Sequence, residues 1–103
     1  MVRAVVRWEI AYGHAKEVFA GLEALTAVCR DRGWAAPTAW APFSGKENEI
    51  IVSYDYPDLA AYVAERDERF ADAEFMQAWR ECARHAAQGS IWNEVLEPVP
   101  DLG

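Results

Sequence analysis

The chain lacks several features that would narrow its function at once. Of its 103 residues only two are cysteines, Cys29 and Cys82, and neither belongs to a C-x-x-C pair or stands in a metal-ligand spacing. Lys and Arg number 10 against 17 for Asp and Glu, so the formal net charge is −7. This acidic balance argues against nucleic acid and anionic membrane surfaces as the main partners. No apolar stretch approaches the roughly 18–20 residues that a membrane span needs.

Length and composition favour one small folded domain. The apolar fraction of 52% is too high for a disordered chain, and the length leaves too little core for two domains. We expect a single domain over residues 1–97 and a loose tail over residues 98–103, where two prolines and a terminal glycine stand.

The expected compartment is the cytoplasm. The opening MVRAVVRWEI does not show a charged region followed by a long apolar core and a small-residue cleavage site, so we do not expect it to be a signal peptide. Both cysteines fall on the apolar faces of predicted helices, where free buried thiols are more common than one disulfide.

Hydropathy patterning predicts alternating strands and helices. Apolar and polar residues alternate in the predicted strands, and the period changes to about 100° per residue in the helices. Gly33 suits the end of the first helix, and Asp72 suits a fresh helix start after a break near Ala71. The predicted elements, in chain order of each type, are strands at residues 2–10, 35–43, 49–56 and 90–97, and helices at residues 14–32, 57–71 and 72–89.

This order, β-α-β-β-α-β with the second helix broken, is the ferredoxin-like pattern of an α+β protein. It predicts an antiparallel four-stranded sheet with helices on one face only. The other face would carry Val5, Ile51 and Val95 among charged residues. Because exposing a half-apolar sheet face to water is unfavourable, we expect a second copy of the chain to cover it.

Three segments together form a recognisable set of motifs. They are the hairpin Gly45-Lys46-Glu47-Asn48, the run from Tyr54 through Pro57-Asp58-Leu59-Ala60 to Tyr62, and the helix restart Asp72-Ala73-Glu74-Phe75 after Arg69. These segments resemble the NIPSNAP-like family. Arg7-x-Glu9 and Gly13-x-x-x-Glu17 are similar to the family's first strand and helix opening, so the resemblance runs from about Arg7 to Glu97.

The resemblance implies a dimeric α+β barrel, in which two sheets pack face to face with helices outside. The wider superfamily includes cofactor-independent monooxygenases of antibiotic biosynthesis, polyketide cyclases and heme-degrading enzymes, with a small-molecule cavity between sheet and helices. The family has no shared catalytic set to carry over, and the heme-contact residues of the heme-degrading relatives are not matched. The resemblance therefore informs the fold more than the function.

Two residues are candidates for proton transfer. His14 stands at the start of the first predicted helix, where it could act as a general acid or base at a cavity mouth, or simply face solvent. Tyr54 has the helix-facing parity of its strand and could supply or accept a proton. A Cys82–His85 nucleophile is disfavoured, because the helical wheel turns His85 to the polar flank.

The aromatic residues are the strongest remaining signal. Trp8 shares the helix-facing parity of Tyr54, while Tyr62 and Trp79 lie on inward helical stripes. The parity of Trp40 and Trp92 is less clear. Trp34, just past the first predicted helix, is assigned to neither the sheet nor the helix layer. Together Trp8, Trp40, Tyr62, Trp79 and Trp92 could line a cavity for an aromatic ligand. The alternative is that they fill the core of a small domain. The charged run at residues 65–69 is interpreted as a solvated helix face.

The sequence thus predicts a homodimeric enzyme acting on an aromatic or polyketide-like metabolite, by cyclisation or cofactor-independent oxygenation. No cofactor or metal is expected, and no nucleotide-binding or metalloprotease motif is present. The alternative is a non-catalytic dimeric ligand-binding or interaction module.

Overall fold

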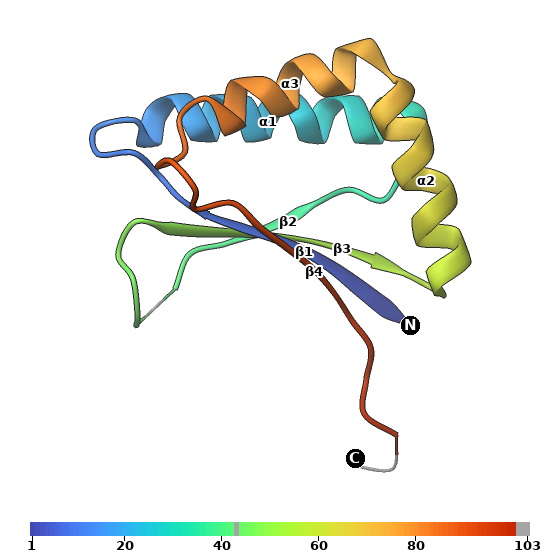
Figure 1. Ribbon diagram of the computed structural model, residues 1–103. Coiled ribbons are helices and arrows are strands. Elements are labelled where there is room, and N and C mark those ends of the chain that lie inside the picture. Colours follow the sequence, from blue (N-terminus) through green and yellow to red (C-terminus); the bar gives the residue numbers. More distant parts are fainter. Residues whose placement is uncertain (43, 101–103) are drawn as a thin grey trace.

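The computed structural model describes residues 1–42 and 44–100. These residues form three helices and four strands, whose arrangement is drawn in Figure 1. They are β1 (Val2–Glu9), α1 (Ala15–Arg32), β2 (Thr38–Trp40), β3 (Glu49–Tyr56), α2 (Leu59–Ala71), α3 (Ala73–Ala83) and β4 (Trp92–Leu96). The order confirms the predicted ferredoxin-like arrangement. Within the described part, no helix is both long and apolar enough to cross a membrane.

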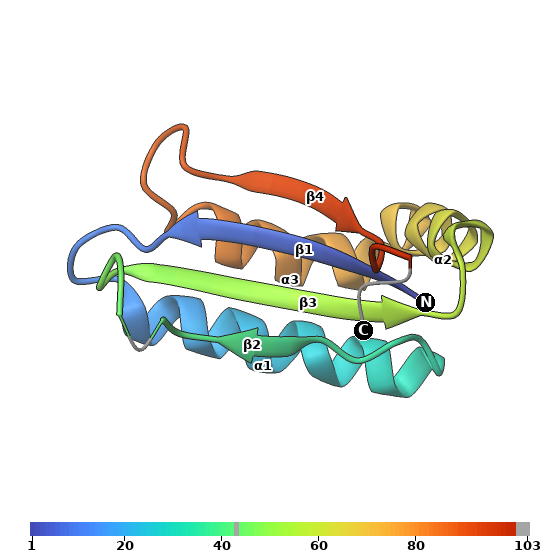
Figure 2. The same ribbon diagram turned by 90° about the horizontal axis from the view of Figure 1, so that it is seen from below.

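The strands form one antiparallel sheet in the order β2-β3-β1-β4. The central strands β1 and β3 pair along their whole length, with Trp8 opposite Ile50 and Ala4 opposite Tyr54. Since directly opposed residues point to the same face of a sheet, this register brings the alternating apolar residues of both strands onto one side. All three helices cover that side and leave the other face open, which is the face turned toward the reader in Figure 2.

The helices α1 and α3 lie side by side on the sheet and close the core. Val18, Leu25 and Cys29 of α1 are almost fully buried, as is Cys82 of α3. The two helices approach closely at Gly21, where an added Cβ would lie 2.8 Å from the Sγ of Cys82. A glycine at this buried position therefore allows the close contact between α1 and α3.

The helix ends follow the predicted capping residues. Gly33 ends α1 with a φ of +72°, a conformation that costs a glycine little. Asp58 begins α2 by accepting a hydrogen bond from the amide of Ala61 at 2.8 Å. Asp72 ends α2 and begins α3, and its carboxylate accepts from the amide of Phe75 at 2.9 Å.

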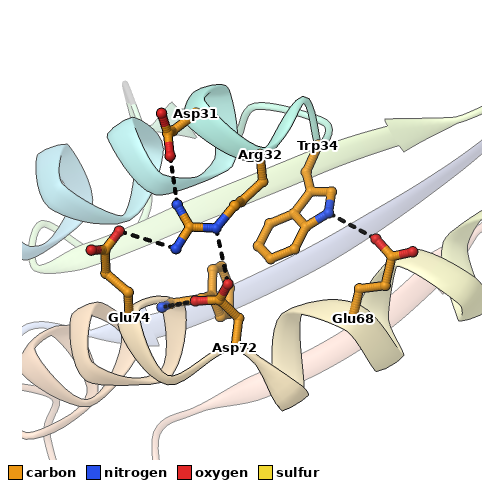
Figure 3. A network of polar contacts seen from close by, with 7 residues as sticks. Asp31, Arg32, Trp34, Glu68, Asp72 and Glu74 are labelled. Carbon is orange, nitrogen blue, oxygen red and sulfur yellow. Dashed lines mark hydrogen bonds and ion pairs between the residues drawn. The ribbon is translucent and has the colours of Figure 1, made fainter.

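A polar network holds the end of α1 against this junction between α2 and α3 (Figure 3). Nε of Arg32 donates to Asp72 at 3.0 Å, and the two other guanidinium nitrogens reach Asp31 and Glu74. Beside it, Nε1 of Trp34 donates to Glu68 of α2 at 2.9 Å. The network therefore ties the end of α1 to α2 through Glu68 and to the start of α3 through Asp72 and Glu74.

Some predicted elements are shorter than expected. Strand β2 spans only residues 38–40, because Pro37 and Pro42 flank it and a proline cannot donate to the sheet. Residue 43, the predicted end of that strand, and residues 101–103 of the predicted tail lie outside the described residues. The last helix ends at Ala83 rather than at Gly89, since the chain turns there to meet the end of β1.

Two side chains face differently from the prediction. The helical period of residues 14–32 predicts Phe19 on the apolar stripe of that helix, but Phe19 is 53% exposed on α1. Val95 was expected on the open face of the sheet, but it pairs with Ala4 and so points to the helix side. The residues of β4 on the open face are instead Trp92, Glu94 and Leu96, which pair with Arg7, Val5 and Arg3. The open face is therefore more aromatic than predicted.

Candidate functional site

A cavity of about 140 Å³ lies between the sheet and the helices α2 and α3. The strands contribute the middle of β1, the Tyr54 position of β3 and residues 93–94 of β4. Side chains of both helices form the opposite wall. The lining residues are Ala4, Val5, Val6, Tyr54, Tyr62, Arg66, Arg69, Phe70, Phe75, Trp79, Asn93 and Glu94.

Arg69 is the most unusual of these residues, because its cationic side chain is buried at 5% exposure. Its guanidinium carbon lies 4.8 Å from the centre of the Tyr54 ring and 5.7 Å from that of Phe75. Nη1 donates to the hydroxyl of Tyr56 and lies 3.4 Å from the carboxylate of Glu65. Three aromatic rings and one carboxylate thus compensate the buried charge.

The prediction for residues 65–69 was wrong at Arg69. A charged residue in a mixed-sign helical run normally faces water. Here α2 crosses the end of β3, where Tyr54 and Tyr56 present ring faces and a hydroxyl to the guanidinium. In the sequence, the only sign that a cation would be buried here was the pair Tyr54 and Tyr56, which stand at alternate positions of a buried strand.

Tyr54 is held as a neutral phenol. Burial raises the pKa of its hydroxyl above the ordinary value, although the charge of Arg69 acts in the opposite direction. Burial likewise raises the pKa of Tyr56. A phenol in this state can donate a hydrogen bond but is a poor proton acceptor near neutral pH. The predicted role of Tyr54 is thereby narrowed to that of a hydrogen-bond donor.

Arg66 supplies a second guanidinium to the same cavity. Its side chain is 38% exposed, and its carboxylate contact, to Asp67, is long at 3.4 Å. The guanidinium carbon lies 5.7 Å from the centre of the Tyr62 ring. Arg66 is therefore free to turn toward a bound group, whereas Arg69 is locked in place.

Three of the predicted site residues meet in this cavity. Tyr54, Tyr62 and Trp79 all line it. Trp8 packs edge-on against Trp79, with ring centres 5.7 Å apart, but it is 1% exposed and does not line the cavity. Trp8 thus supports the wall that Trp79 presents to the cavity.

Trp40 and Trp92 do not join them. Trp40 pairs with Ile51 and Trp92 with Arg7, so both rings lie on the open face of the sheet. Their exposures are 49% and 60%. Their expected place in a cavity between sheet and helices was wrong, because the register of the short edge strands turns them to the opposite side.

His14 also lies away from the cavity. It stands directly before α1, beyond the far end of β1, and its Nδ1 is 2.8 Å from Nδ1 of His85. His85 therefore pairs with His14 and not with Cys82. Burial raises the pKa of the Cys82 thiol to about 11, and that of Cys29 to about 11 as well, so neither thiol is an activated nucleophile.

A wider groove of about 790 Å³ runs along the outer side of α1 and α3. Its floor is made of small side chains, including Ala20, Gly21 and Ala24, and acidic residues border it. His85 lies at one end. In the described ranges, no three His, Cys, Asp or Glu side chains are grouped as a metal would require.

Comparison with known proteins identifies the sequence family. The sequence model of the NIPSNAP family matches residues 5–102, which is nearly the whole chain. No match was found among the curated proteins.

Solved structures with the same fold include a NIPSNAP domain protein from Burkholderia xenovorans. It has a TM-score of 0.78 and 16% identity, over 100% of this chain and 99% of that one. A protein described as an antibiotic biosynthesis monooxygenase has a TM-score of 0.75 and 16% identity, over 97% and 100% of the two chains. A protein of unknown function from Bacteroides thetaiotaomicron, described as a possible oxidoreductase, has a TM-score of 0.69 and 14% identity, over 92% and 94%.

Proposed function

The chain belongs to the NIPSNAP family, and from that premise we propose that it is an enzyme acting on a small aromatic metabolite. The proposed site is the cavity between the sheet and the helices α2 and α3. The reaction is a cofactor-independent oxygenation or a cyclisation. The observation that carries this proposal is the joint presence of two guanidinium groups and several aromatic rings around one cavity.

The size of the cavity restricts the ligand. An apolar cavity of about 150 Å³ is large enough to bind benzene, and this cavity measures about 140 Å³. One aromatic ring fits, flanked by Tyr62, Phe70 and Trp79. A polycyclic polyketide would need α2 to move outward, so a single ring, or the ring end of a longer molecule, is the better candidate.

The charges point to an oxygen-bearing substrate. Both proposed reaction classes pass through a substrate oxyanion, either an enolate or a phenolate. A fixed guanidinium and a movable one, Arg69 and Arg66, would lower the free energy of that anion in a site shielded from water. Asn93 and the neutral phenol of Tyr54 add possible hydrogen-bond donors at the same wall.

Two of the structural relatives are consistent with oxygenation. One is described as an antibiotic biosynthesis monooxygenase and another as a possible oxidoreductase. At 16% and 14% identity they support the shared fold, and the activity of this chain has to be argued from its own cavity.

A non-catalytic ligand-binding module is the second candidate function. It is favoured by one observation, which is that no histidine is among the described residues that line the cavity. The raised pKa of Tyr54 removes the other candidate base. A protein with this lining could bind an aromatic anion without transforming it.

Tryptophan fluorescence tests the site. We expect hydroxylated benzoates, titrated into the tag-free protein, to quench the fluorescence, and we expect neutral analogues such as benzyl alcohol to bind at least tenfold more weakly. Trp79→Phe should remove most of the ligand-dependent change, whereas Trp92→Phe, on the opposite face, is the matched control. If only Trp92→Phe abolishes the response, the proposed cavity is not the binding site.

Oxygen uptake then separates the two functions. An oxygenase should consume O₂ with a bound ligand in the presence of a chelator, and Arg66→Met should reduce the rate. Tight binding with neither O₂ uptake nor a changed product by mass spectrometry would favour the binding module.

We also propose that the functional unit is a homodimer formed through the open face of the sheet. Trp40, Trp92 and Leu96 expose large apolar surfaces there, and such patches are typical of interaction surfaces. Nε of Arg7, on the same face, is buried without an acceptor among the described residues. A facing copy could both cover the rings and supply that acceptor.

Sedimentation analysis tests the dimer. The wild type should sediment as a dimer, and Trp92→Asp should shift it to a monomer. Phe19→Asp is the matched control, because Phe19 is similarly exposed but lies on α1. A wild-type monomer at micromolar concentration would overturn this proposal.

We propose the cytoplasm as the location of the protein. The two free thiols, Cys29 and Cys82, support this proposal, since free thiols suit a reducing compartment.

A further inference from the structure

The two histidines form an isolated pair at the end of the molecule remote from the proposed cavity. They lie 71 positions apart in the sequence, yet their Nδ1 atoms are 2.8 Å apart and their ring centres 5.1 Å apart. They are also the only histidines of the chain. Neither belongs to the lining of the cavity between sheet and helices.

Backbone contacts hold this pair in place. The carbonyl of His85 accepts from the amide of Ala11 at 2.9 Å, and the amide of His14 donates to the carbonyl of Ala11 at 3.0 Å. Ala11, which follows shortly after the end of β1, thus anchors both histidines. A further bond, from the amide of Ala87 to the carbonyl of Glu9 at 2.7 Å, ties the segment after α3 to the end of β1. These backbone hydrogen bonds therefore keep the two imidazoles side by side, so a metal ion could bind both without a rearrangement of the backbone.

We propose that His14 and His85 together bind a divalent transition-metal ion through their Nδ1 atoms. Metal–imidazole bonds measure about 2.0–2.1 Å, so two nitrogens 2.8 Å apart would subtend an angle of about 86° at a metal held equally by both. This is close to the ~90° between neighbouring ligands of a square-planar or octahedral ion and well below the ~109° of a tetrahedral one. Cu²⁺ and Ni²⁺ fit this spacing better than Zn²⁺.

In the neutral metal-free pair, one ring carries its single hydrogen on Nδ1 and the other ring, which carries its hydrogen on Nε2, accepts that bond. Metal binding needs both Nδ1 lone pairs, so the donor ring gives its Nδ1 hydrogen to solvent and takes up one at Nε2, and the neutral pair has no net loss of protons. Because no third protein ligand is grouped with the pair in the described residues, water molecules complete the coordination.

The nearby charges favour a cation. Glu17 is one helical turn beyond His14, and Glu81 is one turn before His85 and borders the same groove as that residue. Glu81 contacts Arg84 at a long 3.4 Å. These carboxylates raise the local concentration of a divalent ion without coordinating it.

Cu²⁺ titration of the tag-free protein, followed by calorimetry and electron paramagnetic resonance, tests this site. We expect one Cu²⁺ per chain and a spectrum with two equivalent imidazole nitrogens. Since the chain has two histidines, that spectrum identifies the pair directly in the wild type. His14→Gln and His85→Gln should each weaken binding at least tenfold and leave one imidazole nitrogen in the spectrum.

The site would be overturned by the absence of binding at micromolar Cu²⁺, by a single-nitrogen spectrum in the wild type, or by unchanged affinity in both glutamine variants. A ratio of one Cu²⁺ to two chains would also contradict it, because the proposed ligands belong to one chain. Circular dichroism of each variant establishes that it is folded before its affinity is compared.

Discussion

Substitution of Gly21 by alanine tests the contact between α1 and α3 on which the helix layer depends. An alanine in the middle of a helix normally stabilises it by about 1 kcal/mol relative to glycine. Here, however, the new Cβ would lie 2.8 Å from Sγ of Cys82 and 3.2 Å from its backbone nitrogen. Either the helices separate or the cysteine side chain moves from a site where it is fully buried.

The overpacking term should prevail. Forcing an extra methyl group into a packed core costs typically about 1–3 kcal/mol, so after the helix-propensity gain we expect Gly21→Ala to lower the free energy of unfolding by about 1 kcal/mol. For a domain of this size that corresponds to a fall in Tm of roughly 4–8 °C. Cys82→Ala removes the sulfur, so the double variant should show a favourable coupling of about 1 kcal/mol relative to the two single variants.

Urea unfolding at one fixed protein concentration, in the presence of a reductant, provides the measurement. Ala24→Gly is the matched control, because Ala24 is an exposed residue of the same helix and its substitution should cost only the propensity difference of about 1 kcal/mol. If Gly21→Ala instead stabilises the protein by the amount that Ala24→Gly costs, the two helices are not in the close contact described above.

Three further predictions concern buried or paired charges and thiols. Arg69→Ala should lower the free energy of unfolding by about 3 kcal/mol, because it leaves the Glu65 carboxylate without its cationic partner. Arg69→Met combined with Glu65→Gln should recover more than half of that loss. Urea titrations measure both. Cys29 and Cys82, buried and with thiol pKa values of about 11, should react with a thiol reagent at pH 8 only after unfolding; rapid labelling of the native protein would contradict their burial. The amide of Phe75 and the guanidinium of Arg32 lower the pKa of Asp72. The stabilising effect of Asp72 should therefore be complete above the ordinary carboxyl range near pH ~4, and it should fade as the pH falls through the lowered pKa. Asp72→Asn should reduce the fall in the free energy of unfolding at acid pH, and an unchanged fall would refute the assignment.

Periodicity predicted the fold well where strands and helices are long. The alternation in residues 2–10 and 49–56 identified β1 and β3 and the side of each that faces the helices. The glycine after α1 and the aspartate before α3 marked helix ends because each solves a local backbone problem, namely a positive φ in one case and unpaired amides in the other. Local chemistry of this kind is readable from neighbouring residues.

The candidate site was predictable only in part. Tyr62 and Trp79 were expected on inward stripes, and both line the cavity. Arg69 was missed, because the burial of a charged side chain depends on the rings that another element brings to it. Trp40 and Trp92 were placed on the wrong side, since a short edge strand between prolines and turns carries too little alternation to reveal its register.

The sequence by itself determined the class of the protein. The order of strands and helices, the acidic charge, the capping residues and the family segments are properties of neighbouring residues, and each acts through local backbone geometry or composition. Only the tertiary structure decided which side chains meet. Arg69 lies among Tyr54, Tyr56 and Phe75, His14 lies against His85, and two tryptophans lie on the open face. These contacts join distant parts of the chain, so they follow from sheet register and helix packing, which the local pattern does not specify.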